Sequence, residues 1–541
     1  SPKSYLNYGD PREGDYKTWN TNKLNIDNDI LVSYKNDFSE KFQFTANAGA
    51  SQFFRKFQQE YNATDGIVVP WVYSLNNTMG NVKASTYYER REIRSLFGTL
   101  TMDMADAFYL TLTARNDWSS TLPKSNNSYF YPSVSLSTLL SNLIKLPDDF
   151  EYLKLYGSWA EVSSDLSPYQ TSSYYSNTGS YSGLPRVTYP SGIVNPEIKP
   201  EKSTSFELGL SSVFFSNRLS FDFTFYNIVD ENQIINLPTS EASGFTSRKV
   251  NGNQYTTNGY EIMLNTNPVR TDELRWDIGL NWTSSVKKLT EIYGGANKFG
   301  NYSLNERVDN YYATGWMKSQ DGKLILNGNT GLPIRDAFPQ RHGHLDPNWR
   351  FGLQNQLTYK EFKIAMDIDG IWGGVIRSLT VEKMWWGGKH PNSTEYRDAE
   401  YAAGKPIYVA EGVNVVSGEL VRDTEGNIIS DTRQYKENTT AVSWQTWSQN
   451  YPYRAKVTEE ESKKFANVFD RSFIKLRKLS VSYDLAKIIN SGAIKNLEVS
   501  AYGYNLAMWK KADIIDPDFG NDNALQDPST RYVGLGVKAT F

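Results

Sequence analysis

The segment that decides the fold runs from Leu219 to Phe225 and reads Leu-Ser-Phe-Asp-Phe-Thr-Phe. Its apolar and polar residues alternate with a period of two, so Leu and Phe share one face while Ser, Asp and Thr share the other. This alternation predicts a β-strand that is apolar on one side and polar on the other. The same pattern recurs in residues 108–115, 276–283 and 533–541.

Strands of this kind are predicted along the whole chain, at roughly the ten-residue length with which a tilted strand crosses a bilayer. Fifteen segments qualify: residues 23–35, 40–52, 88–103, 106–117, 128–139, 151–162, 203–215, 218–230, 257–268, 273–286, 348–359, 362–375, 472–484, 496–507 and 532–541. Short connections such as 216–217 and 360–361 alternate with long ones such as 287–347 and 376–471. Short periplasmic turns and long extracellular loops are typical of bacterial outer-membrane barrels. A soluble sandwich has no reason to keep all its long loops at one end.

The composition agrees with a barrel. Aromatic residues make up 14% of the chain, with 36 Tyr, 26 Phe and 14 Trp, although the mean hydropathy is −0.55. Transmembrane barrels combine aromatic girdles with a polar lumen. The formal net charge of −3 gives no support to nucleic-acid binding. The absence of cysteine excludes disulfides, thiolate nucleophiles and Cys-based metal sites.

The two ends of the sequence carry further expectations. The chain begins Ser1-Pro2-Lys3, so Ser1 is expected to be an internal or processed start. Bacterial single-chain barrels have an even number of strands, and fifteen predicted strands therefore imply at least one strand before Ser1. The last residue, Phe541, closes an alternating strand and resembles the signal that outer-membrane proteins present to the barrel-assembly machinery.

Several longer motifs occur in a fixed order. Residues 115–123 read Arg-Asn-Asp-Trp-Ser-Ser-Thr-Leu-Pro, and residues 194–209 read Val-Asn-Pro-Glu-Ile-Lys-Pro-Glu-Lys-Ser-Thr-Ser-Phe-Glu-Leu-Gly. Further motifs occupy residues 128–135, 153–160, 257–261, 473–483 and 528–532. Together they resemble the SusC/RagA family of TonB-linked outer-membrane transporters from Bacteroidetes, over nearly the whole chain.

The resemblance implies an all-β fold, a transmembrane antiparallel β-barrel. The chain would supply about 14–15 of the family's 22 strands, with long extracellular loops and short periplasmic turns. Residues 1–541 are then the C-terminal part of a single TonB-dependent receptor β-barrel. The family's plug domain, its TonB box and its first strands are absent from this sequence, and we expect them in a missing N-terminal segment.

The resemblance also implies a function. The family imports large nutrients, glycan fragments or oligopeptides, across the bacterial outer membrane. It does so with a SusD-like surface lipoprotein as a lid and with TonB acting through a plug that is not in this chain. Outer-membrane lipid surrounds the barrel, and two transporter–lipoprotein pairs often associate as a dimer. The alternatives are a passive outer-membrane porin or scaffold, and a surface glycan-binding protein or adhesin.

Loop aromatics are the predicted ligand-binding residues, because aromatic faces stack on sugar rings or peptide side chains. The alternative is that they pack the loops or belong to an interface girdle. The residues are Trp372, Trp385, Trp386, Trp444, Trp447, Tyr311, Tyr312, Tyr174 and Tyr175.

No catalytic set, cofactor or metal site is predicted. The chain has three histidines, and His342-Gly343-His344 lacks a carboxylate at usable spacing, so a loop turn is the expected reading. The acidic stretch Asp516–Asp522 fails the EF-hand spacing, although calcium binding there stays open. Between Leu476 and Leu479 the apolar phase slips by one residue, which predicts a β-bulge near Arg477 or Lys478.

Overall fold

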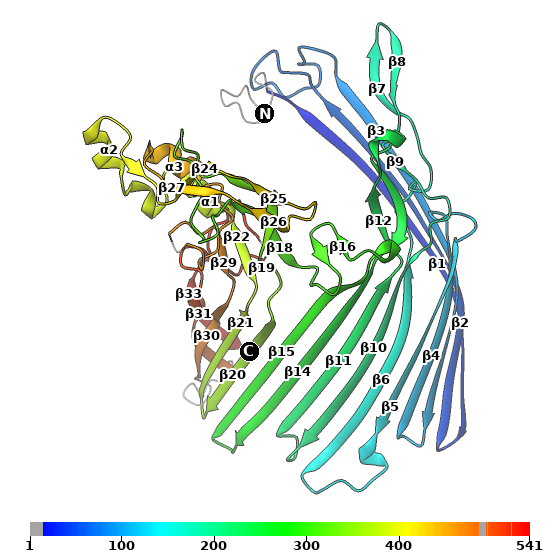
Figure 1. The fold of residues 1–541 in the computed structure, drawn as a ribbon. Helices are drawn as coiled ribbons and strands as arrows, with labels where there is room; N and C mark the ends of the chain where they lie inside the picture. Colours follow the sequence, from blue (N-terminus) through cyan, green and yellow to red (C-terminus); the bar gives the residue numbers. More distant parts are fainter. Residues whose placement is uncertain (1–13, 463, 486–493, 495, 521) are drawn as a thin grey trace. The chain divides into compact units, whose positions relative to one another are not determined.

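The computed structural model describes residues 14–462, 464–485, 494, 496–520 and 522–541. Fifteen strands form one sheet in which spatial order follows the chain (Figure 1). They are β1 (Lys17–Ser39), β2 (Phe42–Ala63), β3 (Lys83–Met104), β4 (Phe108–Ser119), β5 (Ser128–Leu139), β6 (Phe150–Ser164), β10 (Glu201–Phe214), β11 (Leu219–Glu231), β14 (Gln254–Arg270), β15 (Leu274–Glu291), β20 (Trp349–Tyr359), β21 (Phe362–Trp372), β30 (Phe473–Asp484), β31 (Asn496–Lys510) and β33 (Tyr532–Thr540). Each coincides with one predicted segment, so the period-two alternation located every strand of this sheet.

The first three strands are longer than predicted. β1 has 23 residues, and β2 and β3 have 22 each, although about 9–11 residues cross a bilayer. Ladder pairing continues to Lys17 opposite Ala63 and to Ala63 opposite Lys83. The sequence pattern did not predict this extension. The added residues are mostly polar on both faces, so no alternation of apolar and polar residues marks them as a strand.

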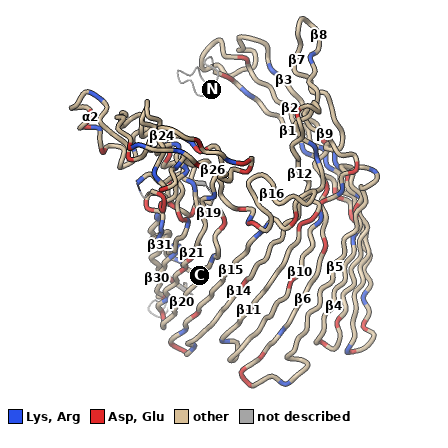
Figure 2. The backbone as a smooth tube through the Cα atoms, in the orientation of Figure 1, with Lys and Arg blue, Asp and Glu red and all other residues tan. Residues whose placement is uncertain are grey.

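Tight turns join neighbouring strands at the short connections. Ser216 and Asn217, between β10 and β11, have φ of 54° and 60°, and Lys360, between β20 and β21, has φ of 52°. Positive φ is the backbone conformation that matches two-residue hairpins to the twist of their strands. In Figure 2 the spans of β11, β14 and β15 are mostly free of charge.

The predicted β-bulge is confirmed. Asp367 of β21 pairs with Lys478, whereas the next residue, Ile368, pairs with Leu476, so Arg477 is left over. The same step appears against β31, where Leu476 pairs with Ala507 and Lys478 pairs with Tyr504. The bulge restores the apolar phase of β30 after Leu476.

The chain divides into two compact units. The first comprises residues 1–143, 155–207 and 228–254, and the second comprises residues 144–154, 208–227 and 255–541. In the first unit, Arg115 Nε donates to Asp117 Oδ1 at 2.8 Å and Tyr131 OH donates to Asp117 Oδ2 at 2.6 Å. These polar residues share one face of β4 and β5, as the sequence predicted for Arg115 and Asp117.

The connections between the strands of the large sheet contain small sheets and short helices. The helices are α1 (Leu379–Trp386), α2 (Arg397–Ala403), α3 (Trp444–Asn450), η1 (Leu140–Asn142), η2 (Glu241–Ser243), η3 (Tyr293–Gly295) and η4 (Pro391–Thr394). The short strands are β7 (Ser176–Tyr181), β8 (Leu184–Thr188), β9 (Gly192–Ile193), β12 (Gln233–Pro238), β13 (Ser247–Gly252), β16 (Lys298–Phe299), β17 (Tyr302–Ser303), β18 (Asn310–Trp316), β19 (Arg335–His344), β22 (Val375–Ser378), β23 (Tyr408–Val409), β24 (Val413–Ser417), β25 (Leu420–Arg422), β26 (Ile428–Asp431), β27 (Gln434–Glu437), β28 (Ala441–Val442), β29 (Val468–Asp470) and β32 (Asp522–Asn523). None of the helices in the described ranges is long and apolar enough to cross a bilayer.

Candidate functional site

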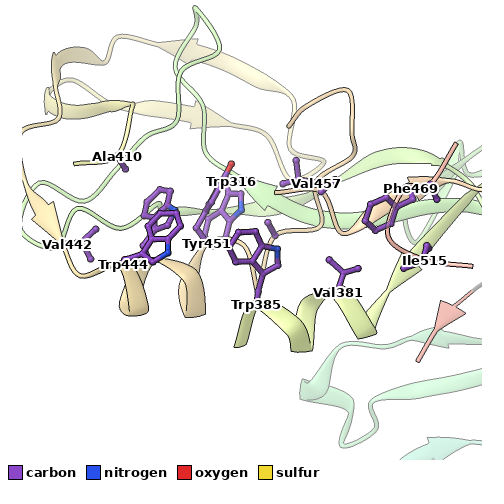
Figure 3. Packing of buried hydrophobic residues seen from close by; sticks show 14 of the residues in the cluster. Trp316, Val381, Trp385, Ala410, Val442, Trp444, Tyr451, Val457, Phe469 and Ile515 are labelled. Atoms are coloured by element: carbon purple, nitrogen blue, oxygen red, sulfur yellow. The ribbon is translucent and has the colours of Figure 1, made fainter. Parts of the chain in front are cut away.

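The main hydrophobic core of the second unit lies in its long connections. We call residues 310–344 and 375–470 the loop module. Its core is rich in aromatic rings, among them Trp316, Trp385 and Trp444 (Figure 3). Trp385, Trp444 and Trp447 are each no more than 2% exposed. Trp316 packs on Tyr451 with ring centroids 5.5 Å apart. Because such burial stabilises structure strongly, these connections form a folded module.

Two helices of the module begin at serine caps. Ser378 Oγ accepts a hydrogen bond from Val381 N at the start of α1, and Ser443 Oγ accepts one from Thr446 N at the start of α3. After Ser443, Trp444, Trp447 and Tyr451 recur at helical spacing, and all three are buried. Capping and one apolar face therefore explain why seven residues form a helix here.

A buried carboxylate ties α1 to the chain that follows α3. Glu382 is 3% exposed. It accepts two hydrogen bonds from Arg377, both at 2.9 Å, and pairs with Lys456. Burial alone would raise the pKa of Glu382, but the hydrogen bonds from Arg377 and Lys456 bring this pKa below its ordinary value. The charged form is thus the one that holds the module together.

The first pocket of the module has a volume of about 640 Å³ and lies between α1, α2 and α3. Its exposed aromatic residues are Trp386, which is 41% exposed, and Tyr401, which is 91% exposed. Its polar lining includes Arg397, Glu400, Lys405, Ser443, Gln445 and Gln449. Aromatic faces beside amides and charges of both signs suit an organic ligand with apolar faces and polar edges.

A second pocket of about 710 Å³ is lined by residues of β18, β23 and α3. Its aromatic lining includes Trp316, Tyr408, Trp447 and Tyr451. Burial raises the pKa of Tyr451 to about 12, so its hydroxyl stays protonated. The rim carries lysines and glutamates that partly neutralise each other, such as Lys323 and Glu437 at 2.5 Å.

Four of the predicted ligand aromatics lie on the helices α1 and α3 of the module, but three of them are core residues. Trp385, Trp444 and Trp447 are almost fully buried, so packing, the alternative reading, describes most of their surface. Trp444 Nε1 donates to Ser393 O at 2.7 Å. Trp386 is the one of the four that presents a large exposed face to the first pocket.

The other predicted aromatics lie outside these two helices. Trp372 ends β21, stacks on Trp349 with centroids 5.9 Å apart, and carries Lys511 over its ring. Tyr311 and Tyr312 lie on β18, and Tyr312 OH donates to Glu306 at 2.6 Å. Tyr174 and Tyr175 belong to the first unit and are 59% and 64% exposed. Within the second unit, Trp372, Tyr311 and Tyr312 line neither of the two pockets, so the structure does not gather its seven predicted residues into one site.

The sequence missed the α2 residues of the first pocket. Arg397 Nη2 donates to Gly388 O at 2.6 Å, and Glu400 accepts from Trp444 N at 2.8 Å. The contact between Glu400 and Trp444 joins segments that are far apart in the chain, which no local pattern reveals. A usable signal was present for α3, because a serine cap followed by aromatics at helical spacing predicts a helix.

A charged cluster fixes the connection 511–531 to β30. Lys475 is 2% exposed, and its Nζ donates to Asp518 Oδ2 at 2.9 Å and to Ser529 Oγ at 2.7 Å. Arg477, the bulge residue, pairs with Asp518 and with Asp369. Asp518 is thus already neutralised by cations, which weighs against the calcium reading of residues 516–522.

No group of three His, Cys, Asp or Glu side chains in the described residues could hold a metal ion. His342 faces Glu461 at 3.6 Å, and His344 Nδ1 lies 2.6 Å from Asp346 O. Both histidines have structural partners, but they lie on the strand β19, so this segment is not the loop turn that the sequence predicted.

Comparison with known proteins identifies the fold. The family model described as TonB dependent receptor-like, beta-barrel matches residues 2–506. TonB-dependent receptor P26 of Formosa agariphila is 23% identical over 99% of this chain and 55% of its own length. TonB-dependent receptor SusC of Bacteroides thetaiotaomicron is 22% identical over 65% of this chain and 38% of its own length. The structure of the RagAB peptide transporter matches with a TM-score of 0.71 and 16% identity over 98% of this chain and 56% of that chain.

The chain spans about half the length of the curated relatives it matches. The predicted resemblance to the SusC/RagA family and the predicted barrel fold are confirmed by these matches. The matched proteins are receptors and not enzymes, in agreement with the sequence prediction. Because the family model covers nearly the whole of it, the chain belongs to the TonB-dependent receptor-like β-barrel family.

Proposed function

We propose that this chain is the C-terminal barrel part of an importer that carries large nutrients, glycan fragments or oligopeptides, across the outer membrane with energy from TonB. The observation that carries the proposal is the loop module. Its folded core holds two pockets of about 640 and 710 Å³ on the long connections of a receptor barrel. Pockets of this size with aromatic and polar linings suit organic ligands.

A barrel of this family lies in the bacterial outer membrane. We propose that a plug domain and further strands in a missing N-terminal segment complete the transporter. Among the strands that the structure describes, β1 and β33 have one neighbour each in the sheet. Unpaired backbone groups are costly in hydrocarbon, so both edges need a partner strand. The half-length match to the relatives supports the same proposal.

We propose further that a SusD-like surface lipoprotein forms a lid over the long connections, and that two such pairs can associate. The support is the similarity to SusC and to the RagAB peptide transporter. Glycan and peptide remain two ligand classes of one proposal, because aromatic faces with amide and charged edges suit both.

The test asks whether transport depends on the first pocket. The full-length protein with Trp386→Ala and Tyr401→Ala should lose ligand uptake and growth on the cognate polymer, because both exposed rings of the pocket are removed. Trp509→Ala is the matched control: Trp509 is 62% exposed on β31 and lines neither pocket. Uptake of labelled oligosaccharides and oligopeptides into cells gives the ligand class.

Two results would contradict the proposal. One is undiminished uptake by the double variant at equal outer-membrane abundance. The other is uptake that persists after the proton gradient is collapsed, since a passive porin does not need that energy.

A further inference from the structure

The first unit places a continuous apolar surface on one face of β1, β2 and β3. Directly opposed residues of an antiparallel pair point to the same side. Three successive rungs contain only apolar residues or glycine apart from one tyrosine: Ile30–Ala50–Leu96, Val32–Ala48–Gly98 and Tyr34–Ala46–Leu100. In a membrane barrel this is the face that contacts lipid. We call it the belt face.

The belt face ends on a tryptophan and a cation. The next rung towards the long connection 64–82 contains Gln52 opposite Arg94, and Arg94 is opposite Trp118 of β4. Trp118 is 38% exposed. Aromatic residues mark the level of the lipid headgroups, and the long connection marks the extracellular side, since the turns at the other ends of these strands are short.

Beyond that level, on the same face, lies a group that we call the outer basic patch: Lys56, Tyr88, Arg90 and Arg94. Lys56 is opposite Arg90 in the ladder. Both cations lie at the Tyr88 ring, with Lys56 Nζ 5.5 Å and Arg90 Cζ 5.1 Å from its centroid. Arg90 also donates to Tyr88 OH. Two like charges are thus held against one ring.

Lys56 and Arg90 lack the carboxylate partners that neighbouring cations of the same strands have. On the opposite face, Arg91 pairs with Asp165 at 2.5 Å, and Arg55 lies 3.9 Å from Glu89. On the face of the patch itself, Arg94 pairs with Glu92 at 2.7 Å, so the charge of Arg94 is compensated. Within the described ranges, Lys56 and Arg90 have no carboxylate partner. The charges of Lys56 and Arg90 are therefore uncompensated where lipid headgroups lie.

We infer that the outer basic patch binds the phosphate-bearing headgroup of an outer-leaflet lipid. Its acyl chains would lie on the belt face below, and Lys56 and Arg90 would contact phosphate oxygens. The patch spans about 13 Å from Arg90 to Arg94 along β3, which accommodates a headgroup of sugar size. Arg and Lys at a membrane surface each add to the affinity for anionic lipid, and the guanidinium fork matches phosphate geometry.

The first test measures lipid that copurifies with the full-length protein in mild detergent. Native mass spectrometry should show phosphorylated glycolipid on the wild type, and Lys56→Gln with Arg90→Gln should reduce its retention by about tenfold or more. Lys35→Gln with Lys41→Gln is the charge-matched control, because both lysines are exposed at the short-turn end of the same strands. Equal retention by wild type and the Lys56/Arg90 variant would overturn the inference.

The second test needs no variant and so stands even if the double variant fails to assemble. Wild-type protein is reconstituted in bilayers that contain the outer-leaflet glycolipid, either intact or after removal of its phosphates. Preferential retention of the intact lipid supports the inference, and equal retention of the two overturns it. Displacement of the lipid by free inorganic phosphate also overturns it, since the patch would then be a phosphate site and not a lipid site.

Discussion

Single side chains in the loop module show how burial sets charge. His390 is 4% exposed and stacks on Trp385 with ring centroids 4.1 Å apart. Burial lowers its pKa to about 4, so the ring is neutral at neutral pH and its Nδ1 accepts from Asn392 N at 3.2 Å. Protonation would place an uncompensated charge against the aromatic core.

A pH dependence follows for the stability of the module. The unfolded chain binds a proton at His390 below pH ~6.5, whereas the folded module does not until about pH 4. The contribution of His390 to the free energy of unfolding should therefore be fully present above pH ~6.5. As the pH falls from there towards 4, the free energy of unfolding should decrease by about 1.4 kcal/mol per pH unit. Hydrogen–deuterium exchange of α1 and η4 at pH 7 and pH 5, corrected for intrinsic exchange rates, measures this loss of stability.

The control for that experiment is His390→Phe, which keeps a ring against Trp385 but cannot take a proton. Its exchange should lose most of the pH dependence in this range. If the variant and the wild type respond alike to pH, another group is responsible and the role given to His390 is wrong.

At the scale of elements, the bulge of β30 shows why register matters. A strand has a period of two, so a shift of one residue moves every later side chain to the other face. With the extra residue Arg477, Ile474 and Leu476 share a face with Leu479 and Val481. The bulge also places Arg477 between Asp369 and Asp518, where it helps to hold the connection 511–531.

Deletion of Arg477 should abolish barrel assembly. Leu479 and Val481 would turn towards the lumen, and Lys478 and Ser480 would turn towards lipid, where a lysine costs about 2–4 kcal/mol at the midplane. Heat-modifiable gel mobility of outer-membrane fractions measures assembly. Arg477→Ala keeps the bulge and should assemble, with faster proteolysis of residues 511–531. Normal mobility of the deletion variant would show that the register can adapt.

The strands could be predicted from the sequence, and the loop module could not. Alternation along Leu219–Phe225 is a local property, because one face meets lipid and the other meets water. In the module, Trp316 meets Tyr451 and Glu400 meets Trp444, from segments that are far apart in the chain. Helices of seven or eight residues are also too short for a period to stand out.

At the scale of the whole molecule, the last strand carries a prediction about assembly. Phe541 follows β33 and is 76% exposed. If it is the barrel-assembly signal, Phe541→Ser should lower the amount of protein in the outer membrane several-fold, while Phe541→Tyr, which keeps the ring, should not. Quantitative blotting of outer-membrane fractions decides it, and equal abundance of the serine variant would remove Phe541 from that role.

The lengths of β1, β2 and β3 have a consequence for what the cell surface presents. At about 3.3 Å per residue and a tilt of about 40°, 22 residues rise more than 50 Å, twice the height of the apolar band. The wall therefore stands well above the headgroups and lifts the chain between Ala63 and Lys83 away from the bilayer. A large protein or particle from the medium, such as an antibody or a phage tail, would contact this rim before it reached any lipid.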